Sequence, residues 1–132
     1  MDSTREALIK LTAEQRVFRL RHVKGLNIVG MGDSSVFGVG DFGDDIGTNG
    51  AGWTGRLAHD LKAERYINLA KNGSRFRHVV KTQLNGAIAM RPDIALICVG
   101  TNDVLRGDFS PPEIESCVER ISSQLTENGT VA

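Results

Sequence analysis

The chain has 132 residues, of which 40% are hydrophobic and 24% charged, and its sixteen basic and sixteen acidic side chains cancel. These values are typical of one small globular domain with a buried core, and a net charge of zero argues against nucleic acid or an anionic membrane as a partner. No apolar run approaches the length of a membrane span, and the polar N-terminus shows no secretory signal, so we expect a cytoplasmic location. The two cysteines predict no disulfide framework.

Helical and strand patterns alternate along the chain. Apolar residues recur at roughly helical spacing from Thr4 to about Arg21, so we expect an N-terminal helix and connector over residues 1–25. Three apolar runs then predict strands, and two amphipathic stretches between them predict crossover helices. The expected strands are Leu26–Met31, Arg65–Leu69 and Ile94–Val99, the expected helices are Trp53–Ala63 and Phe76–Met90, and a loop rich in glycine and aspartate is expected over Gly32–Gly50.

The last helix has a clear start in the sequence. Ser110 is expected to cap it, Pro111 suits its first position, and Glu113 completes a Ser-x-x-Glu capping box. This helix should end near Leu125. Thr130–Ala132 then has the pattern of the first residues of a fourth strand.

This order of elements predicts an α/β fold for residues 26–132. Near-continuous apolar strands joined by crossover helices indicate a parallel sheet that is covered on both faces. Because the sequence stops as a fourth strand begins, we expect a truncated domain whose third strand has an uncovered edge. Such an edge can pair with another chain, so residues 1–132 alone are expected to associate or aggregate.

Three short polar loops each follow one of the predicted strands. They are Gly32–Ser34, Asn72–Ser74 and Gly100–Asp103. Each loop by itself is common turn sequence, but the carboxyl ends of parallel strands meet at one end of a sheet, where ligands bind. A serine, a glycine backbone and an asparagine amide are therefore expected to converge. A nucleophile with two oxyanion donors is what acyl transfer requires.

The same residues carry a family resemblance. Gly32–Gly38, then Gly73, then Gly100–Asp103 is similar to the first three sequence blocks of the SGNH (GDSL-type) serine hydrolases, and Gly52–Trp53 is also similar to many members. The resemblance covers about Leu26 to Ala132. The Gly-x-Asn-Asp block after an apolar strand is its most specific part.

The resemblance implies a flavodoxin-like three-layer α/β/α sandwich that hydrolyses small-molecule carboxylic esters with no metal or other cofactor. It implies Ser34 as the nucleophile, with the backbone N–H groups of Ser34 and Gly73 and the side-chain amide of Asn102 as the oxyanion hole. Asp33 and Asp103 match family positions that are structural rather than chemical.

The sequence departs from the family in its general base. The family's last block is Asp-x-x-His, and this sequence has none. His22 is expected at the opposite end of the first strand from Ser34, and His59 is expected on a helix surface. His78 is the nearest candidate, although Arg75, Arg77 and Lys81 beside it indicate a solvated basic face. Because no histidine is placed to activate Ser34, residues 1–132 alone are expected to show little or no esterase activity.

Two other motifs in the sequence fit their usual functions poorly. Gly38–Gly43 matches the Gly-x-Gly-x-x-Gly dinucleotide fingerprint, but it does not pass directly from strand to helix, and Asp41, Asp44 and Asp45 would repel a pyrophosphate. The aspartates lack EF-hand spacing. A non-catalytic module that binds an anion or carbohydrate through the N–H groups of Asn72–Ser74 remains an alternative to the hydrolase, as does an inactive fragment.

Overall fold

The computed structural model describes residues 15, 25–47 and 51–132. Its sheet contains strands β1 (Asn27–Gly32), β2 (Arg65–Asn68) and β3 (Ile94–Cys98) in the order β2-β1-β3, and all of them are parallel. The strand predictions are therefore confirmed to within one residue at each end. The N-terminal helix that the sequence predicts lies outside the described residues.

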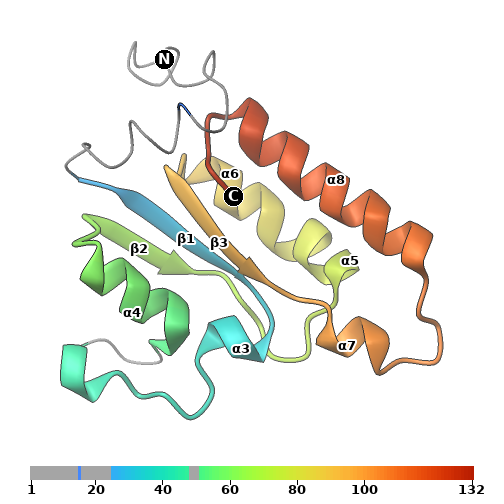
Figure 1. Cartoon of the computed structure of the whole chain (residues 1–132), viewed down its shortest axis with the longest axis horizontal. Helices are drawn as coiled ribbons and strands as arrows, with labels where there is room; N and C mark the ends of the chain where they lie inside the picture. The colour runs from blue at the N-terminus through green and yellow to red at the C-terminus, as the bar shows by residue number, and fades with distance from the viewer. Residues whose placement is uncertain (1–14, 16–24, 48–50) are drawn as a thin grey trace.

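Helices cover both faces of the sheet (Figure 1). Helix α4 (Gly52–Asp60) packs on one face, where Leu26 and Ile28 meet Ala58. The other face carries α5 (Phe76–His78), η2 (Val79–Gln83), α6 (Leu84–Ala89) and α8 (Pro111–Glu127). Alternate residues of β1 point to opposite faces, so Val29 and Met31 enter this second core. The predicted three-layer α/β/α sandwich is confirmed.

The second crossover helix is a single run of three segments, because a π-helical stretch, η2, joins α5 to α6. Five apolar residues of η2 and α6 lie in or against the larger core. They are Val79, Val80, Leu84, Ala87 and Ile88.

The predicted cap of the last helix is half correct. The Ser110 hydroxyl accepts a hydrogen bond from Glu113 N at 3.4 Å, and Pro111 begins α8. The Glu113 carboxylate, however, binds Arg77 rather than closing the capping box. An available guanidinium is a stronger partner for a carboxylate than a backbone N–H group.

The predicted loop over residues 32–50 also differs from the structure, because it contains two short helices. Helix α3 (Ser34–Phe37) starts directly after β1, and the 3₁₀ helix η1 (Asp44–Ile46) follows. Helices of three or four residues leave no periodic pattern, and capping decides whether they form.

The outer edge of β3 is paired at its start. Val131 forms an isolated parallel bridge with Ile94, in which Ala95 N donates to Val131 O at 2.8 Å and Val131 N donates to Asp93 O at 2.9 Å. This agrees with the predicted start of a fourth strand. No helix among the described residues has the length and apolar character needed to cross a membrane.

Candidate active site

The order of the strands places a crevice between the ends of β1 and β3. The chain leaves β1 toward β2 over one face of the sheet and returns to β3 over the other face, so the direction of winding reverses between β1 and β3 (Figure 1). In α/β sheets, ligands bind at such a switch point, outside the carboxyl ends of the strands. A hydrogen bond of 3.2 Å from Asp33 N to Cys98 O joins the two ends.

Ser34 is the first residue of α3 and is half-buried. Buried Asp33 caps this helix, because its Oδ1 accepts hydrogen bonds from Ser35 N at 2.9 Å and from Ser35 Oγ at 2.8 Å. The Asp33 carboxylate is thereby committed to structure. Neither the backbone N–H nor the hydroxyl of Ser34 forms a hydrogen bond with another described residue.

Gly73 lies in the turn after β2 and is exposed. Its φ is +75°, in the left-handed region that favours glycine, and Ser74 N donates to Lys71 O at 3.2 Å to close the turn. The Gly73 N–H donates to no described residue. This loop therefore presents a backbone donor without an intramolecular partner.

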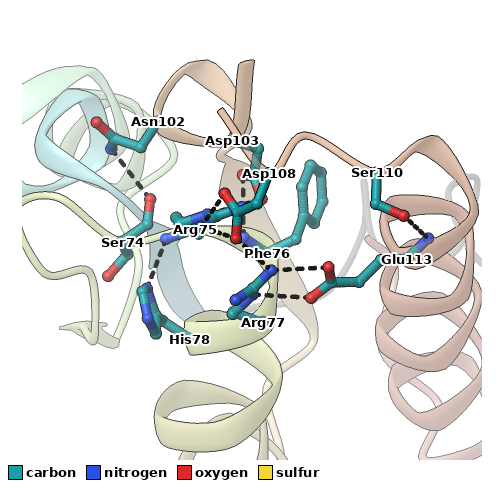
Figure 2. A network of polar contacts seen from close by, with 10 residues as sticks. All are labelled: Ser74, Arg75, Phe76, Arg77, His78, Asn102, Asp103, Asp108, Ser110 and Glu113. Carbon is teal, nitrogen blue, oxygen red and sulfur yellow. Dashed lines mark hydrogen bonds and ion pairs between the residues drawn. The ribbon is translucent and has the colours of Figure 1, made fainter. Parts of the chain in front are cut away.

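Asn102 is the second residue of α7 (Thr101–Val104), which follows β3. Its Nδ2 donates to Ser74 O at 3.0 Å, as Figure 2 shows. A primary amide has a second N–H, which stays available to a ligand. The Asn102 side chain therefore joins the loop after β3 to the loop after β2.

Asp103, the residue next to Asn102, has a buried carboxylate that holds it in place. Asp103 accepts a hydrogen bond from Phe76 N at 3.1 Å and lies 3.5 Å from Arg75 Nε (Figure 2). Arg75 also pairs with Asp108 at 3.0 Å, and this hydrogen bond lowers the pKa of the Asp108 carboxyl. The prediction of a solvated basic face is thus wrong for Arg75, which is buried among carboxylates.

Neither of the two described histidines forms a hydrogen bond with Ser34. His78 is exposed, and its Nδ1 accepts a hydrogen bond from Arg75 N at 3.0 Å, which leaves the proton of the neutral ring on Nε2. His59 is exposed on α4, as predicted. His22 lies outside the described residues.

The acidic loop after α3 is tied to α4 by Arg56. The Arg56 guanidinium binds Asp41 and Asp45, each at 2.7 Å, and these hydrogen bonds lower the pKa of both carboxyls. Within the described ranges, no three side chains of the metal-ligating types come together. The same loop borders an open cavity of about 480 Å³, lined by Phe37, Val39, Phe42 and Asn68, among others.

Sequence reasoning missed one residue that connects these loops. The Gln83 side chain is buried and forms hydrogen bonds with both Gly32 and Ser74. A signal was present, because Gln83 falls four residues after Val79 and beside Leu84, on the predicted apolar face of the helix. A lone polar residue on such a face needs a buried partner.

Comparisons with known proteins agree with the fold. A GDSL-like lipase from Bacteroides thetaiotaomicron superposes with a TM-score of 0.60 and 14% identity, covering 93% of this chain and 56% of its own. A protein described as a GDSL-like lipase from Parabacteroides merdae superposes with a TM-score of 0.57 and 21% identity, covering 80% of this chain and 55% of its own. The chain thus spans just over half the length of either protein.

Sequence comparison identifies the family itself. No curated protein sequence matches the chain. The model of the GDSL-like lipase/acylhydrolase family, however, matches residues 31–131, which include all three polar loops. The chain therefore belongs to the GDSL-like lipase/acylhydrolase family.

Proposed function

We propose that this domain hydrolyses carboxylic esters, with Ser34 as the nucleophile and with Ser34 N–H, Gly73 N–H and the Asn102 amide as oxyanion donors. The observation that carries the proposal is that these donors have N–H groups without a partner among the described residues. The two backbone N–H groups donate to no described residue, and Asn102 uses only one N–H. Donors without partners, held on the same end of the sheet, are what an oxyanion hole requires.

In the proposed reaction, Ser34 Oγ attacks the ester carbonyl carbon and its proton passes to a base. The carbonyl oxygen becomes an oxyanion that the three donors stabilise. As the intermediate collapses, the protonated base returns the proton to the departing alcohol, and an acyl-serine remains. Water then attacks the acyl-serine and releases the acid. Neither His59 nor His78 is bonded to Ser34, so the proposal assigns the base to a group outside the described residues.

The cavity beside α3 offers a place for part of an ester substrate. Phe37 and Ser34 lie three residues apart in α3, so both are on the same side of that helix. The exposed apolar side chains Phe37, Val39 and Phe42 favour an apolar substituent over a charged one. Small esters with an apolar acyl or alcohol group are therefore the proposed substrates.

The alternative of a non-catalytic anion-binding module is less well supported. An anion at the start of α5 would need free backbone N–H groups there. Ser74 N donates to Lys71 O, and Phe76 N donates to the carboxylate of Asp103. Gly73 N–H donates to no described residue, but a carboxylate of the chain itself already occupies this helix start, so the geometry favours the hydrolase.

Steady-state hydrolysis of a short-chain aryl ester by the complete gene product tests the proposal. We expect Asn102→Ala to lower kcat by about 10²–10³-fold and to leave KM nearly unchanged, because an oxyanion donor acts as charge develops in the transition state. Asn72→Ala, at an exposed asparagine in the neighbouring loop, is the matched control and should retain normal turnover. A raised KM with unchanged kcat in Asn102→Ala would instead make Asn102 a ground-state binding residue.

A further inference from the structure

Gln83 places a buried amide beneath the candidate site. The residue has 1% relative exposure. Its Oε1 accepts a hydrogen bond from Gly32 N at 2.8 Å, and its Nε2 donates to Gly32 O at 2.9 Å and to Ser74 Oγ at 3.3 Å. Both N–H groups of the amide are therefore used inside the protein.

The Gln83 amide replaces a missing strand partner. Strand β2 ends at Asn68, which is in register with Gly30, and Gly32 lies two residues further along β1. Lys71 N still donates to Gly32 O at 3.1 Å, but Gly32 N donates to Gln83 rather than to a strand. A buried N–H without a partner is costly, so Gln83 determines how the end of β1 is held.

The π-helical segment explains how Gln83 reaches this position. In η2, Leu84 N donates to Val79 O, five residues earlier. The wider turn allows Val79, Gln83 and Leu84 all to face inward, and each has no more than 1% relative exposure. Single π-helical turns within α-helices are frequent at functional sites.

We infer that Gln83 is a positioning residue that fixes the spacing among the three oxyanion donors. Gly32 lies two residues before Ser34, Ser74 follows Gly73 directly, and Ser74 O accepts the hydrogen bond from Asn102. One amide thus bonds to the backbone near Ser34 and to the side-chain hydroxyl of Ser74, the residue that follows Gly73 and accepts the hydrogen bond from Asn102. This role rests on the proposed function, because it matters for turnover only if the donors act on an ester.

Three variants of the complete gene product test the role by ester hydrolysis. Gln83→Met keeps the side-chain length but removes every hydrogen bond, and we expect kcat to fall by up to about 100-fold with KM little changed, since small misplacements of reacting groups have effects of this size. Gln124→Met is the matched control on α8, where the glutamine side chain bonds to no described residue, and it should behave as wild type.

Gln83→Glu tests whether turnover depends on the hydrogen bond from residue 83 to Gly32 O. Its carboxylate keeps the acceptor for Gly32 N but faces Gly32 O with an oxygen in place of a donor. Burial raises the pKa of a carboxyl group, and protonation at lower pH restores a donor toward Gly32 O. The ratio of kcat in Gln83→Glu to kcat in wild type should therefore rise as the pH falls, whereas the ratio for Gln83→Met should stay flat.

Backbone NMR spectra of the same proteins give a readout that needs no activity. Gln83→Met and Gln83→Glu should shift the amide signals of Ser34 and Gly73 and the side-chain amide signals of Asn102, and Gln124→Met should not. Unchanged signals, or wild-type kcat in both folded Gln83 variants, would overturn the positioning role alone. Wild-type protein that hydrolyses no ester would overturn the proposed function, and the NMR spectra would still decide whether Gln83 sets the spacing.

Discussion

Ser34→Ala is expected to lower ester hydrolysis by the complete gene product by at least about 10³-fold, because it removes the proposed nucleophile that would form the acyl-enzyme. The fold should be unaffected, since the Ser34 hydroxyl forms no hydrogen bond with a described residue. Turnover of a short-chain aryl ester measures the effect, and circular dichroism with thermal unfolding checks the fold.

Ser35→Ala is the matched control for this substitution. Ser35 is exposed and its hydroxyl bonds to Asp33 Oδ1, but its backbone N–H keeps the cap of α3. We expect nearly normal turnover and a small loss of stability. Robust turnover in Ser34→Ala, or equal losses in both variants, would show that Ser34 is not the nucleophile.

Gly32→Ala is expected to have the largest effect on stability. Gly32 has a φ of +141°, and a Cβ at this position would overlap the carbonyl oxygen of Cys98 and lie 3.1 Å from the Val36 side chain. Because Cys98 O also accepts the hydrogen bond from Asp33 N, the clash falls on the contact that joins β1 to β3. We expect the free energy of unfolding to fall by at least about 4 kcal/mol.

Gly40→Ala is the control that separates the effect of a steric clash on stability from the effect of backbone strain. Gly40 has a φ of +82°, but no atom lies within 4 Å of the Cβ that would be added. This variant should lose only about 1–2 kcal/mol, the cost of a left-handed conformation in a residue with a side chain. Urea unfolding of both variants measures the difference, and equal losses would mean that the Cys98 contact does not constrain Gly32.

The sheet could be predicted from the sequence because its strands are covered by helices on both faces (Figure 1). Such strands give continuous apolar runs, as in β1 and β3, and proline and glycine mark where they end. The π-helical turn and α3 could not be predicted in this way. Each depends on a contact distant in sequence or on a single cap, such as Gln83 with Gly32 or Asp33 with Ser35.

The candidate site was predictable in outline but not in its connections. The rule that parallel strands end together places the loops of Ser34, Gly73 and Asn102 at one end of the sheet. The hydrogen bond from Asn102 to Ser74 O and the burial of Arg75 against Asp103 depend on side-chain geometry, which no sequence pattern encodes. The sequence predicts Arg75 on the surface, wrongly, because its carboxylate partners lie about 30 residues away along the chain.

Covalent labelling tests the central claim most directly. A fluorophosphonate reacts with a serine that is activated for acyl transfer and stabilised by an oxyanion hole, and mass spectrometry of the digested complete gene product locates the adduct. The account predicts one adduct on Ser34, retained in Ser35→Ala, lost in Ser34→Ala and formed much more slowly in Asn102→Ala. Absence of an adduct in the wild-type protein, or an adduct that persists in Ser34→Ala, would contradict it.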